Sequence, residues 1–116
     1  MKSKYRIIII PYAELDLKSS VEFFEFQKPG LEKEFIKEVD DVIKRIELNP
    51  KMFPKVRKGA RRALLTRFPF GIYFVVKDDL INIFAVFHFS RDPKKLRKRS
   101  SIFHMTADDI IRKFRK

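Results

Sequence analysis

The stretch FPFGIYFVVKDDLINIFAVFHFSRDP, residues 68–93, decides the fold. It contains two apolar runs, residues 72–76 and 80–87, separated by Lys77-Asp78-Asp79. Runs rich in β-branched and aromatic residues predict strands, and the charged residues between them predict a hairpin turn. Alternate positions of the second run form two apolar sets, Ile81, Ile83, Ala85 and Phe87 against Leu80, Phe84 and Val86. Because both faces are apolar, we expect this hairpin in the middle of a sheet.

Two amphipathic helices are predicted before this hairpin. Apolar residues recur at helical spacing in residues 13–24 and again in residues 31–46. Lys28-Pro29-Gly30 permits a tight reversal between them, and Pro50 ends the second helix because the residue before a proline is pushed out of the helical region. The two apolar stripes are Ala13, Leu17, Val21 and Phe24, and Leu31, Phe35, Val39, Val42 and Ile46.

The remaining elements complete an α+β fold. A short strand, Tyr5–Ile10, is stopped by Pro11, and a second, residues 63–67, precedes a bend or bulge at residues 68–71. We predict an N-terminal strand and an antiparallel two-helix hairpin packed on a four- or five-stranded, mainly antiparallel sheet. A short C-terminal helix is expected from Thr106, which can cap it with Asp109.

Composition limits the classes of function. The 116 residues fit one domain with a single core, and no segment has the roughly 20 apolar residues of a membrane span. The apolar run behind the basic N-terminus is too short for a signal peptide, so we expect a cytoplasmic protein. With no cysteine and only His88 and His104, neither a metal site nor another cofactor is expected.

The net charge of +12 is unevenly distributed. Residues 12–48 carry 6 basic against 10 acidic side chains, whereas residues 49–100 carry 14 against 3. A basic half beside an acidic one indicates a polyanionic partner, so nucleic acid or a nucleoprotein is the expected target.

Two basic clusters account for this charge. We predict nucleic-acid contacts from Lys55, Arg57, Lys58, Arg61 and Arg62 in the first and from Lys94, Lys95, Arg97 and Arg99 in the second. Arginine suits this task because its planar fork binds phosphate bidentately and keeps its charge. The alternative is a solvated basic edge that prevents strand-to-strand aggregation.

His88 has two interpretations. A lone histidine closing an apolar strand is often a packed rim residue. It could instead act as general acid or base in RNA cleavage, where a 2′-hydroxyl must lose its proton and the leaving oxygen must gain one. Arg67 and Arg91 would then stabilise the additional charge on the phosphate.

Several motifs in order resemble the ParE/RelE superfamily of bacterial toxins, also known as the plasmid stabilisation protein family. They are Tyr5–Pro11 with Ala13 and Leu17, then NPKMFP, RRALLTRFPFGIYFVV and INIFAVFHFSRDPKKLRKR. The similarity covers residues 5–99, so we assign residues 1–100 to a ParE/RelE-like domain and residues 101–116 to a helical extension. That extension can pack on the sheet or on a partner, or fray, because so short a helix is marginal alone.

The resemblance implies the toxin of a type II toxin–antitoxin system, with a cognate antitoxin that wraps its basic groove. Members of this superfamily inhibit growth either by ribosome-dependent mRNA cleavage, as metal-independent endoribonucleases, or by poisoning DNA gyrase. Arg67, His88 and Arg91 can be matched to the basic strand and the H-x-x-R-D-P ending of the family, so the resemblance implies that they would act in catalysis if the chain is a nuclease. Two departures, Gly71 where nucleases often carry arginine and the lack of a tyrosine after Tyr73, count against cleavage. The alternative is a non-toxic, basic nucleic-acid-binding module derived from such a toxin.

Overall fold

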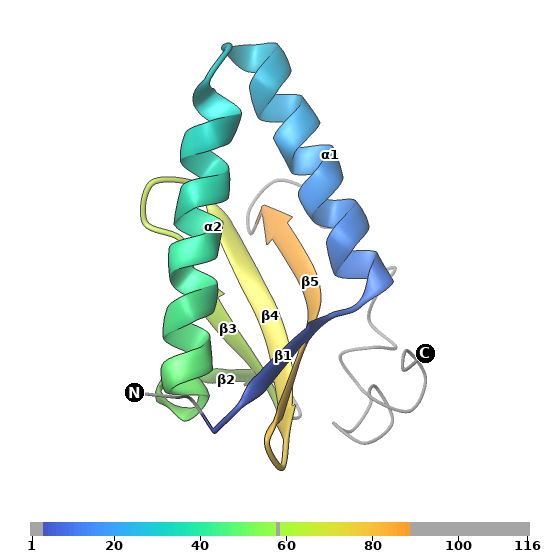
Figure 1. The fold of residues 1–116 in the computed structure, drawn as a ribbon, viewed down its shortest axis with the longest axis vertical. Coiled ribbons are helices and arrows are strands. Elements are labelled where there is room, and N and C mark those ends of the chain that lie inside the picture. Colours follow the sequence, from blue (N-terminus) through green and yellow to red (C-terminus); the bar gives the residue numbers. More distant parts are fainter. Residues whose placement is uncertain (1–3, 58, 89–116) are drawn as a thin grey trace.

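The computed structural model describes residues 4–57 and 59–88, which form two helices over a five-stranded sheet (Figure 1). The strand order is β1-β5-β4-β3-β2, with β1 parallel to β5 and the other neighbours antiparallel. The predicted α+β class is confirmed; the predicted C-terminal helix lies outside the described residues. The elements are β1 (Arg6–Ile9), α1 (Pro11–Gln27), α2 (Leu31–Leu48), the 3-10 helix η1 (Pro50–Met52), β2 (Lys55–Arg57), β3 (Ala60–Leu64), β4 (Phe70–Lys77) and β5 (Leu80–His88).

The β4–β5 hairpin forms the centre of the sheet, as its two apolar runs predict. Lys77 pairs with Leu80, and Asp78 adopts φ 55° in the turn between them. Aspartate tolerates this left-handed conformation better than most residues, which explains the acidic pair at this position. The turn is also joined to β1, because the Arg6 N–H donates to the Asp79 carbonyl at 2.7 Å.

A β-bulge in β5 changes the predicted alternation of side chains. Tyr73 lies opposite Ala85 while Phe74 lies opposite Ile83, so Phe84 is the additional residue. An inserted residue reverses the side-chain phase beyond it. Strict alternation placed Ile83 with Ala85 and Phe87, and this prediction is wrong: Ile83 and Val86 pack with the helices, whereas Ala85 and Phe87 belong to a separate cluster with Phe84.

The two helices form the predicted antiparallel hairpin and cover one face of the sheet (Figure 1). Gly30 has φ 95° just before α2, a conformation that glycine adopts without strain. Pro11 both ends β1 and starts α1, where its missing N–H costs nothing. In α2 the predicted stripe is buried at Phe35, Val39, Val42 and Ile46.

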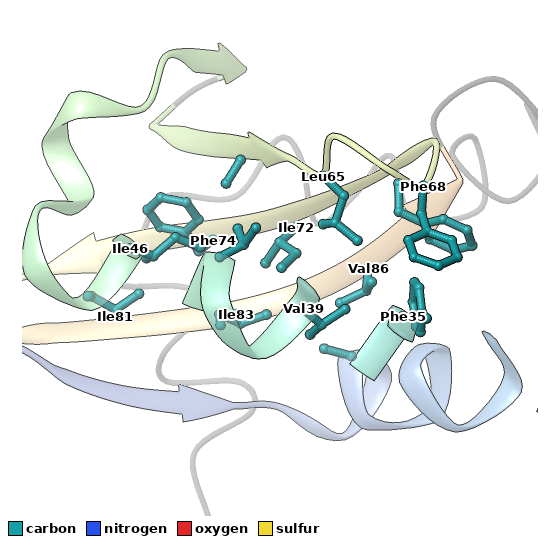
Figure 2. Close-up of a cluster of buried hydrophobic side chains, with 14 of the residues drawn as sticks. Phe35, Val39, Ile46, Leu65, Phe68, Ile72, Phe74, Ile81, Ile83 and Val86 are labelled. Atoms are coloured by element: carbon teal, nitrogen blue, oxygen red, sulfur yellow. The ribbon is translucent and has the colours of Figure 1, made fainter. Parts of the chain in front are cut away.

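Four phenylalanines join the helices to the sheet at the end where β4 begins. Phe24 of α1 and Phe35 of α2 pack against Phe68 and Phe70, with ring centroids 4.9–5.7 Å apart. Figure 2 shows Phe35 and Phe68 at one end of a row that continues through Ile72 and Phe74. Edge-to-face rings of this kind add to the free energy gained by burying them.

A buried carboxylate fastens α1 to the sheet. Asp16 is 3% exposed, and its Oδ2 accepts a hydrogen bond from the Val86 N–H at 2.9 Å. β1 pairs with β5 only as far as Ile83, where the Ile10 N–H donates to the Ile83 carbonyl. Beyond β1, Asp16 therefore satisfies an edge N–H of β5 that would otherwise be buried without an acceptor.

The strand predicted at residues 63–67 is displaced. β3 covers Ala60–Leu64 and pairs with β2, which the sequence did not reveal. Residues 65–69 form a loop closed by a hydrogen bond from the Leu65 N–H to the Phe70 carbonyl. Gly71, predicted in a bend, instead lies within β4 opposite Leu64 and Phe87.

Replacing Phe35 should test the phenylalanine contact between helices and sheet. Phe35 is fully buried, so Phe35→Ala should lower the free energy of unfolding by about 3–5 kcal/mol through lost burial and a cavity. Phe26 on α1 is 89% exposed, and Phe26→Ala should change it by less than about 0.5 kcal/mol. Urea unfolding followed by circular dichroism measures both; equal losses would contradict the assigned core.

Candidate functional site

The predicted site residues divide between the described and undescribed parts of the chain. Lys55, Arg61, Arg62, Arg67 and His88 are described, as is the backbone of Arg57. The other predicted positions lie outside the described residues: Lys58, Arg91, Lys94, Lys95, Arg97 and Arg99.

The β2–β3 edge, together with η1 beside it, carries two exposed lysines. Lys51 in η1 and Lys55 in β2 are both exposed, and Lys55 pairs with Arg61 of β3. No described acidic residue occurs between Asn49 and Lys77. At this edge a phosphate backbone would meet lysine ammonium groups carried by η1 and β2.

Arg61 is used to hold the chain together. Its Nη1 donates to the carbonyl oxygens of Phe53 at 2.5 Å and Lys51 at 3.2 Å. The side chain is half-buried and points to the same side of the sheet as the helices, since Arg61 lies opposite Phe74. We therefore assign Arg61 the role of fixing the backbone of residues 51–53, which carries Lys51. Because the Arg61 guanidinium is used in these hydrogen bonds, Arg61 is less available to bind phosphate.

Arg62 lies on the other face and passes over Gly71. A Cβ built at Gly71 would lie 3.2 Å from both Cγ and Cδ of Arg62 and 3.3 Å from a ring carbon of Tyr73. Glycine therefore allows the Arg62 stem to lie against β4.

Arg67 is held by two glutamates of α2. Its guanidinium forms an ion pair with Glu34, and its backbone N–H donates to Glu38 Oε1 at 3.0 Å. Glu38 Oε2 also accepts from the Thr66 N–H at 2.9 Å and the Thr66 hydroxyl at 2.6 Å. The two carboxylates attach the 65–69 loop to α2 and partly neutralise the arginine charge.

These contacts lower the pKa of Glu38. Burial alone raises it, but hydrogen bonds from the Thr66 hydroxyl and from the N–H groups of Thr66 and Arg67, together with the Arg67 charge, outweigh that effect. Hydrogen bonds to the charged form of a carboxyl favour ionisation.

His88 ends β5 and packs on the helix side of the sheet. It lies opposite Phe70, with ring centroids 5.4 Å apart and planes inclined at 68°. Its side chain is half-buried. Arg67, in the loop before β4, and His88 lie at the same end of the sheet, but the Arg67 side chain is engaged with α2. Within residues 4–57 and 59–88, no group of three or more His, Asp or Glu side chains is arranged to bind a metal ion.

No protein-family profile and no curated protein matches this chain. A solved structure does: the chromosomal ParDE TA system from P. aeruginosa, with a TM-score of 0.65 and 20% identity over 72% of this chain and 94% of that chain. The chain therefore shares the fold of a chain of that ParDE system. At this level of identity the ParE/RelE resemblance is confirmed for the fold, and the ParDE match contributes nothing on individual site residues. Neither described helix is long and apolar enough to cross a membrane.

Sequence reasoning missed the acidic residues that organise this region. Asp16, Glu34 and Glu38 lie on helices whose charged positions look like an ordinary solvated surface. Glu34 and Glu38 are four residues apart, which places them on one face of α2, and this spacing was the available signal. Their partners, Thr66 and Arg67, lie about thirty residues away, a separation that local periodicity does not bridge.

Removing the Thr66 hydroxyl should raise the pKa of Glu38. In Thr66→Val the carboxylate loses one hydrogen bond to its charged form, so the pKa should move up towards its ordinary value near 4.5. NMR titration of the Glu38 side chain measures this, with Ser20→Ala, a hydroxyl loss on α1, as control. An unchanged pKa would show that Thr66 does not stabilise the carboxylate.

The pH dependence of stability follows from the same shift. Because the folded-state pKa lies below the unfolded one, the Glu38 contribution is present above pH 4.5 and is lost as pH falls through the folded pKa. Lowering the pH through that range should therefore reduce the free energy of unfolding of Thr66→Val by less than it reduces that of the parent chain.

Proposed function

We propose that this protein is the toxin of a type II toxin–antitoxin pair that inhibits bacterial growth and is held inactive by an antitoxin. The observation that carries the proposal is that 72% of this chain shares its fold with a chain of a ParDE system. The exposed lysines of the β2–β3 edge support it, because they provide a surface for an acidic or polyanionic partner. We place the action in the cytoplasm, where both kinds of target occur.

Of the two targets that the resemblance implies, we favour DNA gyrase over ribosome-bound mRNA on the evidence of residues 4–57 and 59–88. RNA cleavage needs an acid–base pair and a free cation beside the phosphate. The Arg67 guanidinium is instead paired with Glu34, and the His88 ring packs on Phe70. Gly71 also supplies no side chain to β4.

We assign target contact to the β2–β3 edge. Lys51 and Lys55 are exposed, and the Arg61 hydrogen bonds fix the backbone that carries Lys51. A fixed cation costs less side-chain and loop entropy on binding than one on a mobile loop. The antitoxin would cover this edge, and we expect its covering segment to be acidic.

Growth after induction in a bacterium tests the proposal. The chain expressed alone should arrest growth, and co-expression of the gene beside it should restore growth. The variant Lys51→Ala/Lys55→Ala should weaken the arrest, whereas Lys33→Ala/Lys37→Ala, which removes two exposed lysines from α2, should not. Normal growth with abundant soluble chain would contradict toxicity and favour a non-toxic nucleic-acid-binding module.

A second measurement in the same cells identifies the target independently of whether the chain is toxic. A gyrase poison should induce the DNA-damage response while messenger RNA stays intact, and a His88→Ala variant that folds normally should remain toxic. Messages cut at the ribosome, with cutting lost in His88→Ala, would establish RNA cleavage and overturn the gyrase assignment while leaving the toxin proposal in place.

A further inference from the structure

The face of the sheet opposite the helices is buried and apolar. Val75, Phe84 and Ala85 are 0% exposed, and Phe87 and Tyr73 are 3% and 4% exposed. With Ile10 and Ala60 they form a hydrophobic cluster separate from the one beneath the helices. We call this surface the second face.

No described element covers the second face. The described members of its cluster all come from the strands or from Ile10 beside β1, while α1 and α2 pack on the other face (Figure 1). A sheet buries a face by packing a second layer about 10 Å away, so rings such as Phe84 need a cover.

We propose that the chain's own residues 101–116 are that cover. β5 ends at His88, and the chain continues to residue 116, which leaves enough length to return across the sheet. The 101–116 segment has helix-forming character from Thr106 onward. It contains the apolar residues that such a layer requires: Ile102, Phe103, Met105, Ile110, Ile111 and Phe114.

Two buried hydrogen-bond donors on the second face also favour residues 101–116 as its cover. Arg62 Nε and Asn82 Nδ2 are buried hydrogen-bond donors without a partner among the described residues. Arg62 lies opposite Tyr73 and Asn82 opposite Val75, and directly opposed residues share a face. An unsatisfied buried donor costs roughly 1–3 kcal/mol, so a cover that offers oxygen acceptors is favoured. Residues 101–116 offer such oxygens at Ser101, Thr106, Asp108 and Asp109.

On this proposal the protein has three layers, formed by the helices, the sheet and residues 101–116. This inference does not depend on the proposed toxicity. It restricts where a partner can bind, because the second face and the stem of Arg62 are occupied within the chain itself. The β2–β3 edge, with Lys51 and Lys55, stays accessible.

Tyrosine nitration tests the cover, since Tyr73 lies on the second face and Tyr12 on α1 is 40% exposed. In the full chain, tetranitromethane should modify Tyr12 and spare Tyr73, as read by peptide mass spectrometry. In a chain ending at Ser100, Tyr73 should react at least roughly tenfold faster while Tyr12 is unchanged, a factor equivalent to about 1.4 kcal/mol of docking free energy. Continued protection of Tyr73 in the folded, shortened chain would overturn the proposal.

The full chain provides a second test that does not depend on the shortened chain folding. Nuclear Overhauser effects should connect the methyl groups of Ile110 or Ile111 with ring protons of Phe84 or Phe87. Contacts from these rings only to residues before 101, or an absence of contacts from residues 101–116, would contradict the proposal.

Discussion

The fold depends on burying both faces of the β4–β5 hairpin. The two strands have almost no polar side chain between Phe70 and Phe87, with Asn82 as the main exception, so neither face of this hairpin tolerates water. The two-helix hairpin covers one face and brings four phenylalanines together at one end. The second face needs a cover of its own, and the residues beyond β5 carry the apolar side chains for it.

Charged side chains divide into those that hold the fold and those left for partners. Asp16 completes the edge of β5, Arg61 fixes the segment before β2, and Glu34 and Glu38 hold the loop that carries Arg67. Among the described side chains of residues 51–67, the exposed bases outside these contacts are Lys51 and Lys55. Within this part of the chain, basic composition therefore overstates the number of side chains available to a phosphate backbone. The same division weakens an acid–base mechanism at this end of the sheet, because both Arg67 and His88 have packing or pairing roles.

Elements that are specified by a local pattern of residues could be predicted from the sequence. Hydrophobic spacing located both helices, and two apolar runs around Asp78-Asp79 located the central hairpin. The bulge at Phe84 was missed because every neighbouring residue is apolar, so a one-residue shift leaves no mark on the pattern. The engagement of Arg67 was missed because its partner Glu34 lies 33 positions earlier in the chain. Local sequence patterns give no sign of a charge that serves a contact distant in sequence, and the binding role of the basic β2–β3 region stays a prediction.

Native-state hydrogen exchange of the full chain tests most directly the claim that the β4–β5 hairpin, buried on both faces, organises the fold. Amides of β4 and β5 should exchange slowest and together, at the free energy of global unfolding, while β2 at the sheet edge should exchange through smaller local openings. Fast exchange in β4 and β5 with greater protection in the α1–α2 hairpin would contradict the account, because the helices would then be the stable unit and the sheet the part that depends on them.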